Sequence, residues 1–126
     1  MHENEIGTII VDCAVKLHVM TGPGLFESVY EVLLARTLEE KGLVVDRQVG
    51  IPIQLGDIAF KEGFRADLVI EGKVIVELKS VDAVHPAHQK QFLTYLKLSQ
   101  LKFGYLLNFG NHRMKDGITR IINGTL

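Results

Sequence analysis

The sequence has a single cysteine, Cys13, no long apolar run and no strong excess of either charge. One cysteine excludes an internal disulfide and a zinc cluster built from several cysteines. No apolar run approaches the roughly 20 residues that a membrane-spanning helix requires. The first residues, MHENEIG, lack the basic and then hydrophobic pattern of a secretory signal. These absences predict no membrane partner and a cytoplasmic location. The length of 126 residues predicts one domain over residues 1–126.

The formal net charge of −1 conceals an uneven distribution of charged residues. Residues 1–78 contain 13 acidic and 7 basic side chains, whereas residues 79–126 contain 2 acidic and 7 basic ones. The C-terminal third is therefore predicted to present a modest positive surface, suited to a phosphate backbone. Ordinary solvated lysines explain the same counts, because the whole chain lacks the strongly basic profile of a dedicated nucleic-acid-binding protein.

The hydrophobic pattern predicts helices and strands in the order typical of an α/β fold with a mixed central sheet flanked by helices. Apolar residues recur at helical spacing before Gly22-Pro23-Gly24 and again from about Leu25 to Lys41. Pro52 lies between two extended segments and marks an edge, a bulge or a strand start. The remaining predicted elements are strands at Leu43–Val49, Ile51–Leu55 and Ile58–Lys61, a hairpin at Arg65–Ser80, a helix from Pro86 to about Leu101, and strands at Phe103–Phe109 and Ile118–Ile122.

Three charged side chains, Asp67, Glu77 and Lys79, interrupt the apolar hairpin Arg65–Ser80. A buried carboxylate without a partner costs several kcal/mol or shifts its pKa, so two of them beside a lysine require an explanation. One explanation is a structural salt bridge with Lys79. The other is a divalent-metal site, in which Asp67 and Glu77 supply hard oxygen ligands and Lys79 faces a substrate.

The metal-site hypothesis makes a demand on the turn of the hairpin. Glu77 and Lys79 are two residues apart, so they share one face of a strand. A two-residue turn at Glu71-Gly72 would pair Ile70 with Lys73 and leave Asp67 on the wrong face. An odd-length loop or a β-bulge is therefore required to bring the two carboxylates to the same face.

The predicted helices add further candidates. Glu27 lies in the first turn of the second helix, where an acid is favourable near the positive helix end. On the third helix His88, Gln91 and Tyr95 share one stripe, either facing the sheet or half exposed at its edge. Arg65 shares a strand face with Asp67, and is expected to neutralise Glu77 or to bind a phosphate.

Several motifs resemble those of known nucleases. The pattern D-(x9)-E-L-K, from Asp67 to Lys79, resembles the PD-(D/E)XK nuclease superfamily, although Ala66 stands where the name has proline. Residues 24–30 spell G-x-x-E-x-x-Y, which resembles the signature of the bacterial GxxExxY proteins grouped with those nucleases. Residues 91–95 spell Q-x-x-x-Y, similar to a motif that follows the catalytic lysine in recombination exonucleases.

The resemblance implies a PD-(D/E)XK nuclease-like core and a role for each candidate. Glu27, Asp67, Glu77 and the backbone carbonyl of Leu78 would hold Mg²⁺ or Mn²⁺. Lys79 would orient the attacking water and stabilise the transition state. Gln91 would position the nucleophile or the scissile phosphate. The expected supporting residues are Arg65, His88, Tyr95 and Tyr30.

The sequence thus predicts a metal-dependent nuclease acting on nucleic acid, with DNA as the expected substrate. One alternative is a catalytically silent nucleic-acid-binding or assembly module of the same fold. A different metal-dependent hydrolase is the other, for which no G-x-S-x-G or P-loop motif is present. A homodimer formed through a terminal element is also expected, because a small domain with little net charge has limited surface for gripping a duplex.

Overall fold

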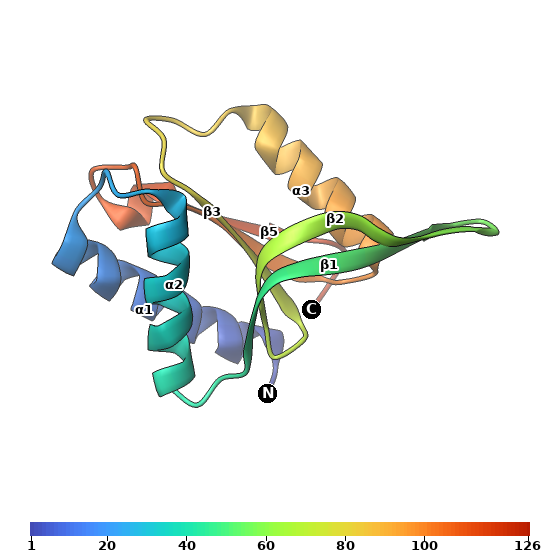
Figure 1. Cartoon of the computed structure of the whole chain (residues 1–126), viewed down its shortest axis with the longest axis horizontal. Helices are drawn as coiled ribbons and strands as arrows, with labels where there is room; N and C mark the ends of the chain where they lie inside the picture. Colours follow the sequence, from blue (N-terminus) through green and yellow to red (C-terminus); the bar gives the residue numbers. More distant parts are fainter.

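The computed structural model describes residues 1–126, which form a five-stranded sheet with helices on both faces (Figure 1). A single 3₁₀ turn, η1 (Met114–Gly117), precedes the last strand. None of the helices combines the length and apolar composition needed to cross a lipid bilayer. The main elements in chain order are α1 (Glu3–Thr21), α2 (Glu27–Glu40), β1 (Val45–Leu55), β2 (Ile58–Ile70), β3 (Val74–Lys79), α3 (Pro86–Ser99), β4 (Phe103–Asn108) and β5 (Ile118–Ile122).

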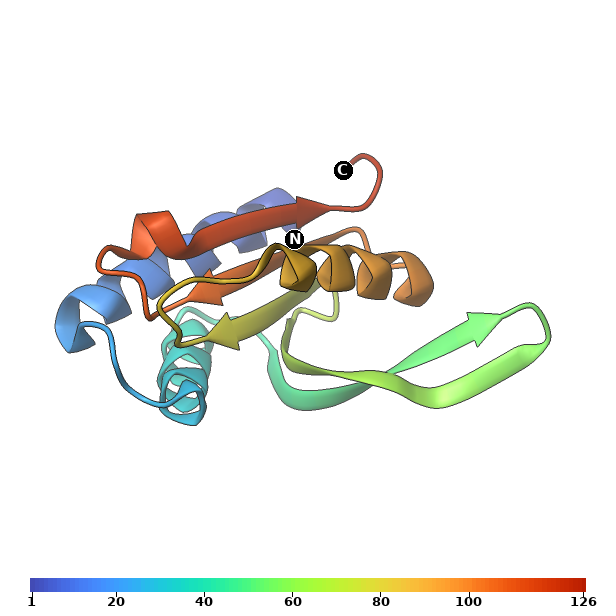
Figure 2. The ribbon, with the colours of Figure 1, turned by 90° about the horizontal axis from the view of Figure 1, so that it is seen from above.

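The five strands lie in the sheet in their sequence order, β1-β2-β3-β4-β5. β3 and β4 are parallel and are connected through α3, whereas all other neighbours are antiparallel. This confirms the predicted mixed sheet flanked by helices. Because β3 and β4 run in the same direction, their carboxyl ends lie at the same end of the sheet (Figure 2).

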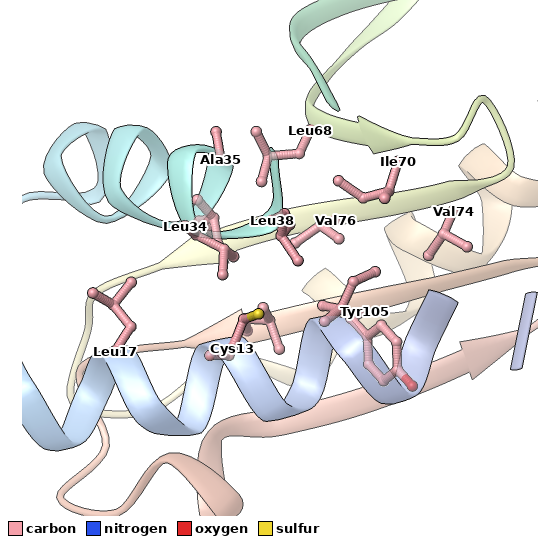
Figure 3. Close-up of a cluster of buried hydrophobic side chains, with 14 of the residues drawn as sticks. Cys13, Leu17, Leu34, Ala35, Leu38, Leu68, Ile70, Val74, Val76 and Tyr105 are labelled. Atoms are coloured by element: carbon pink, nitrogen blue, oxygen red, sulfur yellow. The ribbon is translucent and has the colours of Figure 1, made fainter. Parts of the chain in front are cut away.

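The larger core lies between one face of the sheet and the helices α1 and α2 (Figure 3). Cys13 and Leu17 from α1 meet Leu34 and Leu38 from α2, and all four side chains are buried. The strands contribute alternate residues to this face, as a period of two requires. The strand residues of this cluster include Leu68, Ile70, Val74, Val76, Leu78, Tyr105 and Leu107.

The smaller core lies between the opposite face of the sheet and α3. Phe92 and Leu96 of α3 pack there with Ile75 and Val69 of the strands. Gly104 makes this packing possible, because a Cβ at that position would lie 2.4 Å from the Phe92 ring. The odd-numbered residues of β3 therefore face α3, while the even-numbered ones face α1 and α2.

The strands β1 and β2 are longer than predicted and form an arm that extends beyond the rest of the molecule (Figure 2). Two predicted pairs of elements are single strands, since β1 continues through Pro52 and β2 includes the segment at Ile58–Lys61. β1 is the edge strand and has only β2 as a neighbour, so a residue without an N–H is tolerated there. The pairing register of β1 and β2 shifts at this proline, between Ile51 and Ile53.

Candidate metal and nuclease site

The turn between β2 and β3 determines which residues of the hairpin face each other. Ile70 pairs with Val74, so the loop contains three residues, Glu71 to Lys73. Glu71 and Gly72 both have positive φ, of 54° and 65°. Continuing the register by one pair beyond Leu68 and Val76 places Asp67 opposite Glu77. The odd-length loop that the metal-site hypothesis required is thus present in the structure.

The carboxyl groups of Asp67 and Glu77 interact directly. The pKa of Glu77 is raised to about 8, first by burial and then by repulsion from the Asp67 carboxylate and a hydrogen bond between the two side chains. Lys79 acts in the opposite direction and offsets only part of the increase. Asp67 itself is held by the Leu78 backbone N–H, which donates to its Oδ2 at 2.8 Å. The Glu77 carboxyl group therefore keeps its proton at a pH at which an exposed glutamate is ionised.

A small cavity of about 20 Å³ lies where β3 faces α3. Two buried polar atoms at this position, Glu77 Oε1 and His88 Nδ1, have no hydrogen-bond partner. Buried polar atoms are nearly always paired, so two orphans around one cavity indicate a site for a water molecule or an ion. The polar residues that line the cavity are Glu77, Lys79, His88, Gln91 and Tyr95.

The stripe on α3 that was identified from the sequence faces this cavity. Gln91 is exposed at its rim, whereas His88 and Tyr95 are half-buried. Tyr95 stacks on Phe64 of β2, with ring centroids 4.0 Å apart. Burial raises the pKa of the Tyr95 hydroxyl, and the Glu77 carboxylate raises it further. The stripe therefore combines packing against β2 with an electrostatic interaction between Tyr95 and Glu77.

Lys79 makes no ion pair in the structure. The four salt bridges involve other residues, and no hydrogen bond from the Lys79 ammonium is present. Its side chain lies on the same face of β3 as Glu77 and lines the same cavity. The structural salt bridge that was the alternative explanation for this lysine is therefore absent.

The carboxylates of Glu27, Asp67 and Glu77 do not converge on one point in the structure. No three His, Cys, Asp or Glu side chains lie close enough together to hold one ion. Glu27 is exposed in the first turn of α2, and α2 covers the sheet face opposite to the one from which Glu77 projects. The Ser80 hydroxyl donates to the Leu25 carbonyl at 2.6 Å, which holds this end of α2 beside the end of β3.

Glu31, which the sequence did not single out, is the α2 carboxylate connected to Asp67. Its side chain is only 8% exposed and receives two hydrogen bonds from Arg47, at 2.9 and 3.1 Å. The Gln48 amide donates to Glu31 Oε1 and, at 3.3 Å, to Asp67 Oδ1. An acid in the inward stripe with Leu34 and Leu38 was the available signal in the sequence.

Gln48 joins these groups at the cost of an unusual backbone conformation. Its φ is 51°, a region that residues other than glycine rarely occupy. Its neighbours Arg47 and Val49 pair with β2, while Gln48 itself is skipped in the ladder. Strained residues of this kind persist where the surrounding structure holds them, and they cluster at functional sites.

Two other predicted residues lie apart from the cavity. Arg65 forms an ion pair with Glu62 at 2.7 Å and donates to the Gln48 carbonyl, so its expected pairing with Glu77 is wrong. Tyr30 is fully buried, stacks on Phe109 and donates its hydroxyl to the Gly22 carbonyl at 2.6 Å. It closes the loop between α1 and α2.

The donor set at the end of β3 fits a small divalent cation. Asp67 and Glu77 provide two adjacent carboxylates, and Glu77 Oε1 is unpartnered. Mg²⁺ binds through one or two carboxylates and retains several waters, so it does not require a protein cage of many ligands. Asp67 keeps lone pairs for a ligand even while it accepts hydrogen bonds, since a carboxylate has about four acceptor positions.

Comparison with known proteins gives one result that covers nearly the whole chain. Residues 4–121 match the family model described as PD-(D/E)XK nuclease superfamily. A search of curated proteins gave no match. The family match includes every residue discussed at the cavity, from α2 to α3, and agrees with the mixed sheet and the paired carboxylates on β2 and β3. The chain therefore belongs to the PD-(D/E)XK nuclease superfamily.

Proposed function

We propose that this protein is a Mg²⁺- or Mn²⁺-dependent nuclease that hydrolyses phosphodiester bonds in nucleic acid. The observation that carries the proposal is the pair of facing carboxylates, Asp67 and Glu77, beside a lysine without an ion-pair partner. Family membership supports the same activity, since these nucleases generally use divalent metals. DNA is the proposed substrate, and the G-x-x-E-x-x-Y motif supports placement among the bacterial GxxExxY proteins, with a cytoplasmic location.

Asp67, Glu77 and the Leu78 carbonyl would hold the cation. When bound, the metal would lower the pKa of a coordinated water and polarise the phosphate. The Glu77 carboxyl must release its proton before it can bind a cation, because only the ionised form is a ligand. Glu27 remains a predicted further ligand because of its G-x-x-E-x-x-Y motif. It lies in the first turn of α2, the end that the hydrogen bond from Ser80 to Leu25 holds beside β3.

Lys79 would contribute through its free ammonium group. Its position on the same strand face as Glu77 allows it to orient the attacking water and to stabilise the negative charge that develops on the phosphate. Gln91, exposed at the rim of the same cavity, would hold the scissile phosphate. During hydrolysis a water oxygen bonds to phosphorus, the bond from phosphorus to the leaving oxygen breaks, and that oxygen takes up a proton.

The test is cleavage of labelled single-stranded DNA, double-stranded DNA and RNA by purified protein. We expect cleavage with Mg²⁺ or Mn²⁺, none in EDTA, and a loss of at least about 100-fold in Glu77→Gln. Glu27→Gln tests the predicted additional ligand, with the exposed Glu40→Gln on the same helix as the matched control. Binding of these nucleic acids without any cleavage would favour the catalytically silent module.

A further inference from the structure

A second cavity, of about 470 Å³, lies between the end of α1 and the loop that follows β4. This volume is within the range of about 300–1,000 Å³ that small-ligand pockets have. Val15 and Met114 contribute apolar surface, and Arg113 and Lys115 contribute cationic groups, together with two histidines, His18 and His112. None of the residues that line the cavity is acidic.

The cationic groups of this pocket have donors left over for an anion, whereas His18 is held in place by a hydrogen bond. His18 is buried, and its Nε2 lies 2.9 Å from the Asn111 carbonyl oxygen, so Nε2 is the donor in this contact. Arg113 uses Nε for an exposed ion pair with Asp116, which leaves its terminal nitrogens without a partner. Lys115 forms no ion pair.

A chain of amide contacts connects the pocket to the proposed catalytic strand. Lys79 and Asn108 are paired residues at the ends of β3 and β4. The buried Asn108 side chain accepts from the Val81 N–H and donates to Val81 O and to Asn111 Oδ1. Asn111 in turn is held by His18. The carboxyl ends of β3 and β4 lie at the same end of the sheet (Figure 2). The pocket is lined from the α1 side of this end, and the proposed catalytic cavity is lined from the α3 side.

We propose that this pocket binds one nucleotide of the substrate strand, at a distance from the bond that is cut. The base lies against the apolar wall formed by Val15 and Met114, and a phosphate lies against Arg113 and Lys115. Every base has an apolar face, so such a pocket adds affinity with little sequence preference. This inference rests on the proposed nuclease function, because it treats the occupant as part of the substrate.

The experiment uses a 5′-phosphorylated thymidine tetranucleotide and thymidine monophosphate in EDTA, with binding measured by NMR on isotope-labelled protein. We expect the tetranucleotide to shift the signals of Val15, His18 and Met114 and to bind more tightly than the mononucleotide. Arg113→Ala with Lys115→Ala is expected to weaken binding at least about 10-fold and to reduce its salt dependence. The matched control is Lys97→Ala with Lys102→Ala, two exposed lysines outside the pocket.

The outcomes separate this inference from the nuclease proposal. The protein could cleave nucleic acid while both double variants bind the tetranucleotide equally well. That result would support the nuclease proposal and refute the proposed nucleotide site. Equal affinity for the two probes would identify a free nucleotide as the ligand and would also refute it. Signals in the pocket that shift with protein concentration alone would identify a second copy as the occupant. If the wild-type protein binds the tetranucleotide at this pocket but cleaves no nucleic acid, the nuclease proposal is refuted and nucleotide binding at the pocket is supported.

Discussion

Glu77 has the most strongly shifted pKa of any residue in the protein. Its pKa is raised from 4.5 to about 8, because the side chain is buried beside Asp67. Between these values the folded state holds a proton that the unfolded state has lost, so stability falls as the pH rises through this window. A shift of this size corresponds to at most about 5 kcal/mol.

We therefore predict that the metal-free protein loses stability between about pH 4.5 and pH 8 and changes little from this group above that range. Denaturant unfolding in EDTA at a series of pH values measures the slope. Glu77→Gln should flatten it, because the amide has no proton to lose. Mn²⁺ should restore stability at pH 8, where it binds the ionised site. An equal slope in wild type and variant would show that Glu77 is not the group responsible.

The sequence located several of these residues but not their full surroundings. Spacing alone was sufficient to place Glu77 with Lys79, and His88 with Gln91 and Tyr95, because strand and helix periods are fixed. The sequence did not determine the length of the turn. Glu71 and Gly72 both adopt positive φ, and the sequence signals this conformation only at the glycine. The position of Glu27 relative to the sheet depended on which face α2 covers, and local patterns do not specify this.

At the scale of elements, the arm formed by β1 and β2 contrasts with the rest of the sheet. Leu55, Ile58 and Phe60 near its tip are exposed and belong to neither hydrophobic core. The sequence predicted shorter strands here, because Pro52 normally ends a ladder. On an edge strand with a register shift, the same proline is tolerated.

We expect the triple variant Leu55→Ser, Ile58→Ser and Phe60→Ser to change the free energy of unfolding by no more than about 1 kcal/mol, since these side chains bury little surface. Leu34→Ala in the larger core is the contrasting variant and should cost about 2–5 kcal/mol. Chemical denaturation measures both. A large loss in the arm variant would mean that its tip is buried in solution, against a second copy or against the body of the protein.

For the whole molecule, the sequence favoured a homodimer formed through a terminal element. Exposed apolar side chains do gather near the end of α1 and the start of α2, where Met20 and Phe26 are each at least 81% exposed. Exposed apolar patches often mark interaction sites. A dimer through this surface would leave the cavity between β3 and α3 open on each copy.

We predict that light scattering at micromolar concentration gives the mass of a dimer, and that Met20→Glu with Phe26→Glu returns the mass of a monomer. Both substitutions are at exposed positions, so the fold should be retained. A monomeric wild-type protein would exclude this assembly. A monomer that cleaves as efficiently as the dimer would show that assembly is not needed for activity.

The central claim is that Lys79 serves chemistry and not stability, and Lys79→Ala tests it most directly when cleavage and unfolding are measured on the same sample. Because Lys79 has no ion pair, we expect cleavage to fall at least about 100-fold while the free energy of unfolding changes by less than about 1 kcal/mol. Lys97→Ala on α3 should change neither quantity. A Lys79→Ala variant that unfolds several kcal/mol more easily, yet cleaves normally per folded molecule, would contradict the account.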